Sequence, residues 1–184
     1  MGKITTFNFT TLNGYYKGPQ GEISWHKHEK EESEFSQEGL SKKNILLFGR
    51  MTYQMMAGFW PTAAGMANDP IVAKGMNEAE KIVFSRTLKN ADWNNTSLIK
   101  ENMLDEIRKL KKTSAKDMTI LGSGSIVAAL AEEGLIDEYQ IMIDPVALGD
   151  GGTLFSGLKK QLDLKLVNTR VFKSGVVLLC YQPK

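Results

Sequence analysis

The chain has 184 residues, of which 42% are hydrophobic and 24% charged, and this composition is typical of a soluble globular protein with a real core. Its length predicts a single domain over residues 1–184. The net charge is only +2 without a basic stripe, so we expect no nucleic-acid partner. No apolar run approaches the roughly 20 residues of a membrane span, and the single Cys180 excludes an internal disulfide framework. Together these features indicate a cytoplasmic protein without a membrane partner.

The N-terminal part of the chain predicts a strand, a loop, a helix and a second strand. Lys3–Thr10 (KITTFNFT) is rich in the Thr, Phe and Ile that favour strands. The loop that follows contains Asn13-Gly14 and is long enough to act as a lid. Trp25–Gly39 is charged and predicts a helix that stops at its glycine. Asn44–Phe48 (NILLF) is wholly apolar, which is the signature of a strand buried on both faces.

The same alternation of helices and strands continues to the C-terminus. We expect helices at Arg50–Ala57, Met103–Lys112 and Ser125–Glu133, and strands at Lys81–Phe84, Met118–Leu121, Glu138–Ile143, Leu162–Phe172 and Val176–Tyr181. The last two strands are joined by Lys-Ser-Gly, which favours a hairpin. The sequence therefore predicts an α/β fold with a mixed, mostly parallel sheet of about eight strands, flanked by helices and ending in an antiparallel hairpin.

The strongest local signal is TILGSGSI at 119–126, where a buried strand turns through Gly122 and Gly124 into a helix. Such a turn directs backbone N–H groups and the helix dipole at whatever lies above the strand end. Ser123 and Ser125 can add side-chain hydrogen bonds. We interpret the turn as a phosphate or pyrophosphate site, with a tight turn that binds nothing as the alternative. Only 60 residues follow Gly124, too few for a full Rossmann domain.

Two other predicted strand ends have an arginine beside hydroxyl groups. Gly49-Arg50-Met51-Thr52 follows NILLF, and Ser85-Arg86-Thr87 follows KIVF. Because ligands bind beyond the carboxyl ends of parallel strands, we expect Arg50, Arg86 and the Gly122 turn to converge on one anion-binding edge. Two arginines with hydroxyl groups suit an adenosine 2′-phosphate, which indicates NADP rather than NAD. The alternative for each arginine is a solvated surface charge.

These segments resemble, in order and spacing, the nucleotide-binding segments of dihydrofolate reductase. They resemble more closely the riboflavin-biosynthesis reductase domain, the C-terminal half of bifunctional deaminase-reductases. The matching motifs are KNILLFGRMTY at 43–53, KIVFSR at 81–86 and ILGSG at 120–124. TLNGY at 11–15 is similar to the family's S-L-D-G start, and PVALGDGGTLF at 145–155 to its P-x-x-x-G-x-G-x-x-L-F segment. The resemblance covers nearly the whole chain.

The resemblance implies a dihydrofolate-reductase-like fold that binds NADPH and transfers a hydride to a pyrimidine- or pteridine-type heterocyclic substrate. Its nearest named reaction is the reduction of 5-amino-6-(5-phosphoribosylamino)uracil in riboflavin biosynthesis. The alternatives are dihydrofolate reduction and a non-catalytic NADP-binding module. The riboflavin-type relatives also imply a homodimer. By matching position, the cofactor-binding residues are Gly49, Arg50 and Thr52 for the phosphates, Ser85 and Arg86 for the 2′-phosphate, Gly122, Ser123, Gly124 and Ser125 for the pyrophosphate, and Asn8 near the nicotinamide.

The catalytic candidates are less clear than the cofactor-binding residues. Hydride transfer needs the nicotinamide and the substrate stacked closely, water excluded, and at most one proton donor. Dihydrofolate reductase has one carboxylate on its first helix, and Glu31, Glu32 and Glu34 all match by spacing; we select Glu32. Riboflavin-type reductases have Asp where this chain has Asn13. An asparagine at this position can orient a substrate but cannot give a proton at neutral pH.

The aromatic residues Phe9, Trp25 and Tyr53 are the predicted substrate-binding residues, because the nicotinamide is expected beside Phe9 and planar side chains can line a pocket for a planar ring. Core packing is the alternative for Trp25 and Tyr53. His26 and His28 could point to one side of a strand as metal ligands. The sequence specifies no third ligand, so we predict no metal site.

Overall fold

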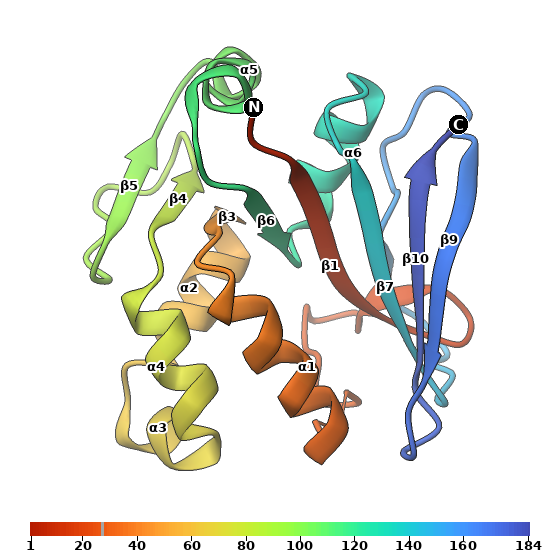
Figure 1. Ribbon diagram of the computed structural model, residues 1–184. Coiled ribbons are helices and arrows are strands. Elements are labelled where there is room, and N and C mark those ends of the chain that lie inside the picture. Colours follow the sequence, from red (N-terminus) through yellow and green to blue (C-terminus); the bar gives the residue numbers. More distant parts are fainter. Residues whose placement is uncertain (27) are drawn as a thin grey trace. The chain divides into compact units, whose positions relative to one another are not determined.

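The computed structural model describes residues 1–26 and 28–184. The strands are β1 (Ile4–Thr11), β2 (Tyr15–Lys17), β3 (Ile45–Gly49), β4 (Lys81–Phe84), β5 (Thr96–Ile99), β6 (Met118–Leu121), β7 (Glu138–Asp144), β8 (Gly152–Thr153), β9 (Leu164–Val171) and β10 (Val177–Pro183) (Figure 1). The helices are α1 (Lys30–Ser41), α2 (Arg50–Ala57), α3 (Ala63–Asn68), α4 (Pro70–Glu78), α5 (Met103–Thr113) and α6 (Gly124–Glu132). Among the described residues, none of these helices has the length and apolar character needed to cross a membrane.

The strands confirm the predicted α/β fold. Eight of them form a sheet in the order β5-β4-β3-β6-β1-β7-β10-β9, and β2 pairs with β8 in a small second sheet. The pairs β3–β4, β4–β5 and β1–β7 are parallel. Strand β10 runs antiparallel to both β7 and β9. The predicted C-terminal hairpin is present, and its turn uses Gly175 at a φ of 90°, a value that favours glycine.

By its internal contacts the chain divides into two compact units. The first unit comprises Met1–Lys3 and Lys30–Thr119, and the second comprises Ile4–Glu29 and Ile120–Lys184. The single domain expected over 1–184 stays a prediction. Each unit has its own parallel strands and its own strand-to-helix turn, so each is described separately below.

The first unit is built on the parallel strands β3, β4 and β5. The side chains of Leu46, Leu47 and Phe48 are buried, as are all four residues of β4. This burial explains why β3 appears as a continuous apolar run in the sequence and why β4 departs from that pattern only at Lys81. Helices α3 and α4 were not predicted. Helix α4 begins with a recognisable signal, because Asp69 accepts hydrogen bonds from the N–H groups of Ile71 and Val72 and Pro70 is the first helical residue.

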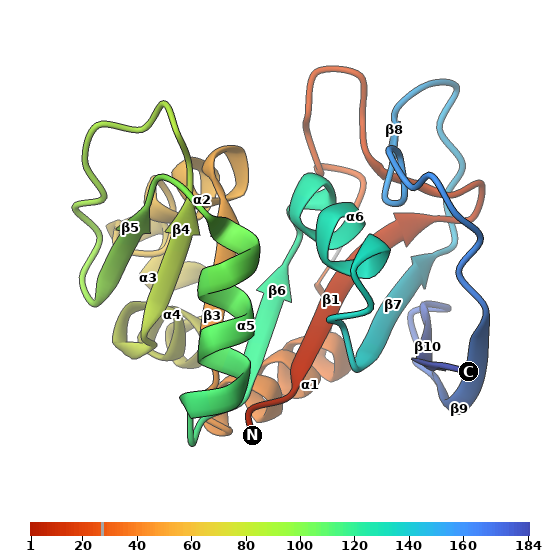
Figure 2. The ribbon, with the colours of Figure 1, turned by 90° about the horizontal axis from the view of Figure 1, so that it is seen from above.

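The second unit is built on β1 and β7, which pair in register from Thr5↔Glu138 to Thr11↔Asp144. Helix α6 lies over one face of this pair (Figure 2), and it buries Ile126, Val127 and Leu130. Because the strands are parallel, the residues after Thr11 and Asp144 emerge at the same edge.

The predicted helix at Trp25–Gly39 is displaced in the structure. Helix α1 begins at Lys30 and continues through Gly39 to Ser41. Trp25 lies in a turn and His26 in an irregular segment before the helix. The helix ends where Lys43 takes a positive φ of 55° and its N–H donates to the carbonyl of Leu40. A left-handed residue stops the helix here, so Gly39 is not the terminator.

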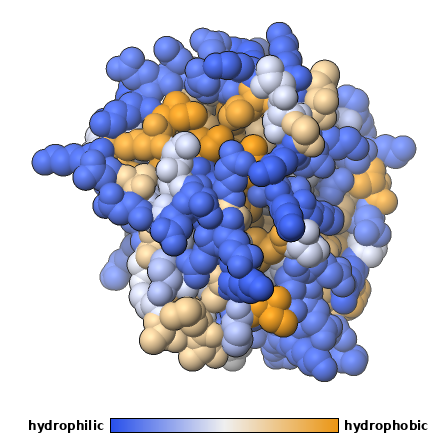
Figure 3. All heavy atoms as spheres, turned by 60° about the vertical axis from the view of Figure 1, so that its left-hand side comes forward, coloured by the Kyte–Doolittle hydropathy of each residue, from blue (hydrophilic) through white to orange (hydrophobic). Residues whose placement is uncertain are grey.

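The hydrophobic side chains left on the surface do not form one continuous face in the view of Figure 3, where apolar patches are separated by hydrophilic residues. The largest exposed apolar side chains of the first unit include Met51, Met66 and Ile71, at 69%, 48% and 61% exposure. Scattered apolar residues of this kind are common on protein surfaces and need no partner.

Lys81 is a charged residue in the core of the first unit. It is fully buried at the start of β4, and its Nζ donates to the carbonyls of Met76, Asn77 and Ala79 at 2.9, 3.3 and 2.6 Å. These carbonyls belong to the C-terminal end of α4, so Lys81 caps that helix. The ammonium group also lies 4.5 Å from the centre of the Trp93 ring. Despite these contacts, desolvation by burial lowers the pKa of Lys81 to about 8.

We expect the stability of the wild-type chain to rise, relative to Lys81→Met, between about pH 8 and pH 10. The pKa of Lys81 is about 8 in the fold and 10.5 ordinarily, so the unfolded chain binds more protons in this window and raising the pH favours the folded state. The slope is at most about 1.4 kcal/mol per pH unit. Above pH 10 the pKa of Tyr139, raised by burial to about 12, lowers the stability of both chains alike as the pH rises and therefore cancels in the difference. Urea unfolding at several pH values measures the difference, and a difference that does not change with pH contradicts the assignment.

Candidate functional site

In the first unit, the predicted cofactor-binding residues lie at adjacent strand ends. Gly49 ends β3 and caps the N-terminus of α2 with extended backbone, so Arg50 is the first helical residue. Gly49 pairs with Phe84 of β4, and Arg86 follows two residues later. Both arginines are exposed. The structure therefore brings Arg50 and Arg86 to the same edge of the first unit, beside a helix N-terminus that favours negative charge.

The predicted hydroxyl residues at this edge have different surroundings. The Ser85 hydroxyl accepts hydrogen bonds from the N–H groups of Thr87 and Leu88 at 3.3 and 3.0 Å, so it shapes the turn that presents Arg86. Thr52 lies in the first turn of α2 and is half-buried. These positions make Ser85 a residue that organises the loop and leave Thr52 beside the helix N-terminus.

In the second unit, the glycine turn has the geometry of an anion-binding nest. Gly122 and Ser123 both take left-handed conformations, with φ of 59° and 55°. Helix α6 begins at the next residue, and Ser123 makes no side-chain cap hydrogen bond to it. Ser125 is exposed in the first turn. Successive backbone N–H groups in such a turn, followed by a helix N-terminus, form a concave site for an anion.

Gly124 has a packing role that the sequence did not reveal. A β-carbon at this position would lie 2.8 Å from the Tyr16 ring, so any side chain here would require the Tyr16 ring to move. A glycine at this position also lets a ligand approach the backbone. The structure adds that glycine lets Tyr16 of β2 pack directly on the start of α6, so this aromatic ring covers one side of the turn.

Asn8 supports the glycine turn from within the second unit. Its side chain is buried, and its Nδ2 donates to the carbonyl of Gly122 at 3.1 Å. Its Oδ1 accepts a hydrogen bond from the Thr6 hydroxyl. Both ends of the amide are therefore engaged inside the protein. We conclude that Asn8 holds the Gly122 turn in position, and its predicted contact with a nicotinamide ring stays a prediction.

Asn13 joins two loops of the second unit. Its Oδ1 accepts from the Thr11 hydroxyl at 2.8 Å and from the Leu148 N–H at 3.2 Å, and its Nδ2 donates to the Leu148 carbonyl at 2.7 Å. The predicted lid after β1 is thus fastened to the loop after β7. Because its amide is used in this way, Asn13 is placed to position the loop rather than to donate to a substrate.

A cluster of ionisable side chains lies at the carboxyl ends of β1 and β7. His26 Nδ1 lies 2.9 and 3.0 Å from the two carboxylate oxygens of Asp144, and both side chains are only 4% exposed. His26 Nε2 lies 3.2 Å from Nδ1 of His28. The His26 ring also stacks on Phe9, with centroids 3.6 Å apart. Phe9, a predicted substrate-binding residue, therefore forms the wall of this cluster.

Trp25 lies next to the same cluster. Its ring centroid is 6.1 Å from that of His26 in an edge-to-face arrangement. Its indole Nε1 is buried and makes no hydrogen bond within the described residues. A buried N–H donor without an acceptor is costly, so this group is suited to meet an acceptor atom of a ligand. Phe9 and Trp25 are thus brought together, whereas Tyr53 belongs to the first unit.

Sequence reasoning missed the cluster of Asp144, His26 and His28. The spacing of the two histidines was noticed, but a carboxylate that lies 118 residues away from His26 gives no local signal. Within residues 1–26 and 28–184 no group of three His, Cys, Asp or Glu side chains is arranged to hold a metal ion.

The remaining catalytic candidate, Glu32, lies in the first unit. It is fully buried on α1, whereas Glu31 is half-buried and Glu34 is exposed, with its carboxylate 3.9 Å from Lys30. Burial thus distinguishes Glu32 from the two neighbours that matched equally well by spacing. A buried carboxylate is rarely retained on a helix unless it has a partner or a function.

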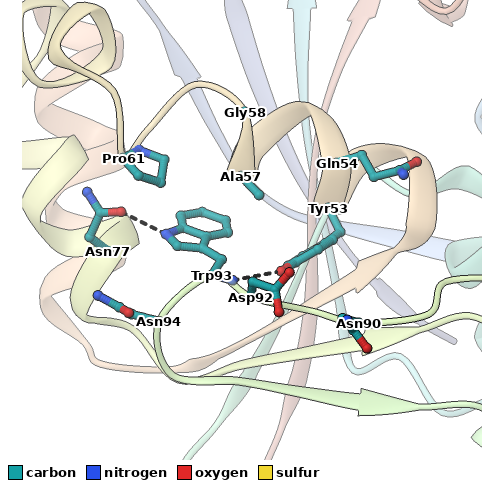
Figure 4. Close-up of a pocket in the computed structure, with 10 residues that line it drawn as sticks. All are labelled: Tyr53, Gln54, Ala57, Gly58, Pro61, Asn77, Asn90, Asp92, Trp93 and Asn94. Atoms are coloured by element: carbon teal, nitrogen blue, oxygen red, sulfur yellow. Dashed lines mark hydrogen bonds between the residues drawn. The ribbon is translucent and has the colours of Figure 1, made fainter.

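Tyr53 lines a pocket of about 500 Å³ in the first unit, together with Gln54, Ala57, Gly58, Pro61, Asn77, Asn90, Asp92, Trp93 and Asn94 (Figure 4). The Tyr53 side chain is buried, and its hydroxyl accepts from the Trp93 N–H at 3.1 Å. The Trp93 indole donates to Asn77 at 2.7 Å. The lining contains one carboxylate and no arginine or lysine, so this pocket is unsuited to a phosphate-bearing group.

Comparison with known proteins shows which family the chain belongs to. A family model described as the RibD C-terminal domain matches residues 2–178. YyaP, an uncharacterized protein of Bacillus subtilis (strain 168), is 34% identical over 93% of this chain and 89% of its own length. YwjB, a second uncharacterized protein of that organism, is 23% identical over 96% of this chain and 95% of its own length.

Solved structures show the same fold at lower identity. A putative riboflavin biosynthesis protein from Shewanella sp. PV-4 has a TM-score of 0.76 and 22% identity, covering 100% of this chain and 99% of that one. A deaminase/5-amino-6-(5-phosphoribosylamino)uracil reductase from Thermotoga maritima has a TM-score of 0.71 and 13% identity over 57% of its length. Dihydrofolate reductase from Enterococcus faecalis, complexed with NADP(H), has a TM-score of 0.65 and 16% identity, covering 97% of its length. The fold is therefore dihydrofolate-reductase-like, and with the family match over residues 2–178 the chain belongs to the RibD C-terminal domain family.

Proposed function

We propose that this protein is an NADPH-dependent reductase that transfers a hydride to a pyrimidine- or pteridine-type substrate. The nearest named substrate is 5-amino-6-(5-phosphoribosylamino)uracil. Membership of the RibD C-terminal domain family supports the proposal, as does a likeness in fold to a protein whose name includes reduction of that uracil. The homodimer expected from the riboflavin-type relatives remains part of the proposal.

The observation that carries the proposal is a pair of strand-to-helix turns, one in each unit, that suit phosphate groups. In the first unit, Gly49 leads into α2 with Arg50 at its first position and Arg86 at the neighbouring strand end. In the second unit, Gly122 and Ser123 lead into α6 through two left-handed residues. NADPH has phosphate at two places, in the pyrophosphate that joins its two nucleosides and in the 2′-phosphate of its adenosine, and an arginine suits the 2′-phosphate. When bound, NADPH supplies the hydride.

The cofactor would be held by the residues at these two turns. Arg86 would bind the 2′-phosphate, and Arg50 with the first N–H groups of α2 would bind a phosphate nearby. The Gly122 turn would hold the pyrophosphate, with Ser125 exposed beside it.

A second candidate function, dihydrofolate reduction, is favoured by Glu32. A single buried carboxylate on the first helix can accept hydrogen bonds from the ring N–H groups of a pterin or a pyrimidine. In either reaction Glu32 would orient the ring. The two functions therefore differ in the substrate accepted rather than in the residues that hold the cofactor.

We expect Arg86→Ala to weaken NADPH binding by about 1.5–3 kcal/mol, the range for a lost hydrogen bond to a charged group. Binding of NADH should hardly change, because NADH lacks the 2′-phosphate. Fluorescence titration of both cofactors measures the two affinities. Lys89→Ala, which removes another exposed cation of the same loop, is the matched control and should leave both unchanged. Equal weakening of NADPH and NADH would make Arg86 structural, and no NADPH binding by the wild type would overturn the proposed function.

We expect NADPH oxidation with the ribosylamino-uracil and little with dihydrofolate. Glu32→Gln should raise KM for the uracil by about tenfold or more, because the orienting carboxylate then offers a weaker, uncharged acceptor. Glu34→Gln on the exposed side of α1 is the control and should behave as the wild type. Turnover of dihydrofolate alone would establish the second candidate. NADPH binding without turnover of either compound would leave two alternatives, a reductase with a different substrate or a non-catalytic binding module.

A further inference from the structure

The hydrogen-bonded series Asp144–His26–His28 runs from the interior of the second unit to its surface. Asp144 is 3% exposed at the end of β7, the His26 side chain is 4% exposed, and His28 is exposed. The steps are 2.9 Å from Asp144 to His26 Nδ1 and 3.2 Å from His26 Nε2 to His28 Nδ1. The series therefore connects a buried carboxylate to a solvent-facing imidazole through one intervening ring.

The carboxylate fixes the positions of the protons along this series. An ionised Asp144 can only accept, so His26 Nδ1 must donate to it. The neutral His26 ring then has its lone pair on Nε2, which must accept from Nδ1–H of His28. A second proton on the His28 ring, at Nε2, gives an imidazolium whose charge is balanced by Asp144. A carboxylate behind an imidazole has this orienting and charge-balancing effect in catalytic triads and in metal sites.

The surroundings suggest that this arrangement does more than hold the segment in place. Phe9 stacks on one face of His26 with ring centroids 3.6 Å apart. The His28 ring meets Phe9 edge-to-face with centroids 5.3 Å apart, so both imidazoles contact the end of β1. The Thr11↔Asp144 pair places the cluster at the carboxyl edge of parallel strands, where ligands bind in such sheets. The buried indole N–H of Trp25, which has no acceptor within the described residues, lies beside it.

We propose that Asp144, His26 and His28 form a hydrogen-bonded relay in which Asp144 and His26 orient and charge-balance the outer member, His28, as the proton donor of the reductase reaction. This inference rests on the proposed function. Reduction of a C=N or C=O bond adds a hydride to carbon, with NADPH oxidised to NADP⁺, and leaves an electron pair on the nitrogen or oxygen. The His28 imidazolium gives its Nε2 proton to that atom, which forms the new N–H or O–H bond, and His28 is then reprotonated from solvent. His26 and Asp144 are positioning residues that act through His28.

The other candidate donors do not meet the requirements of this step. Asn13 cannot give a proton at neutral pH, and its amide is held by Thr11 and Leu148. Glu32 is assigned to orienting the ring in the proposed function. A histidine titrates close to neutral pH, which is the range in which a general acid is most effective.

The first test follows the two imidazoles by long-range ¹H–¹⁵N NMR in the protein without ligand. We expect His26 to be protonated at Nδ1, and His28 to gain its second proton at a higher pH in the wild type than in Asp144→Asn. Asp150→Asn is the matched control, because it removes an exposed carboxylate from the loop after β7 and should leave the titration unchanged. Identical His28 titrations in the wild type and Asp144→Asn would overturn the relay.

The second test uses NADPH oxidation with the ribosylamino-uracil across a pH series. His28→Gln lies at the exposed end and should fold even if the buried variants do not. We expect it to lower kcat by about 100-fold, to leave the Kd for NADPH unchanged, and to abolish the fall in kcat at high pH that deprotonation of the donor causes. His26→Gln should lower kcat and move this fall to lower pH. A His28→Gln variant with an unchanged kcat and pH profile would refute the proposed donor.

The two proposals fail in distinguishable ways. If the wild-type protein does not bind NADPH, the proposed reductase function is wrong. The role of His28 as its proton donor is then also wrong, whatever the NMR titration shows. If the wild-type protein binds and oxidises NADPH, and His28→Gln has the same kcat and pH profile as the wild type, only the proposed relay is wrong.

Discussion

Parallel pairing of strands is the constraint on which the rest of this structure depends. In the first unit the pairing of Gly49 with Phe84 decides that Arg50 and Arg86 emerge side by side. In the second unit the pairing of Thr11 with Asp144 decides that the loop after β1 meets the end of β7. Parallel strands run in one direction, so whatever follows each strand gathers at one edge. The parallel pairing thus determines which candidate residues at the strand ends lie near one another.

The turns at that edge are supported from inside the protein. Asn8 is buried and binds the carbonyl of Gly122, and Tyr16 packs so closely on Gly124 that a β-carbon there would require the ring to move. Asn13 fastens the loop after β1 to the loop after β7 through Leu148. Asn8 and Asn13, which the sequence predicts as site residues, thus also fix the backbone. A preformed anion site requires this support, because free backbone N–H groups bind well only when they are already aligned.

Buried charge follows the same logic in both units. Lys81 is stabilised by three carbonyls at the end of α4, and Asp144 is stabilised by the imidazole of His26. An isolated buried charge costs several kcal/mol, so each of these groups is held in a fixed geometry by its partners. The two buried groups differ in whether their hydrogen bonds continue to the protein surface. The contacts of Lys81 end at backbone carbonyls, whereas those of Asp144 continue through His26 to an exposed ring.

The sequence by itself determined the strands with continuous apolar runs, the helices that follow glycine turns, and the membership of a reductase family. β3 is a buried, continuously apolar strand, and the turns after β3 and β6 contain glycine, so these features are visible locally. The start of α1 and helices α3 and α4 were not predicted, because weakly amphipathic segments are fixed by packing rather than by propensity. Only the tertiary structure selected Glu32 from three neighbouring glutamates, by burial. It also brought Asp144 to His26 across 118 residues, a contact that depends on strand register and that no local pattern can specify.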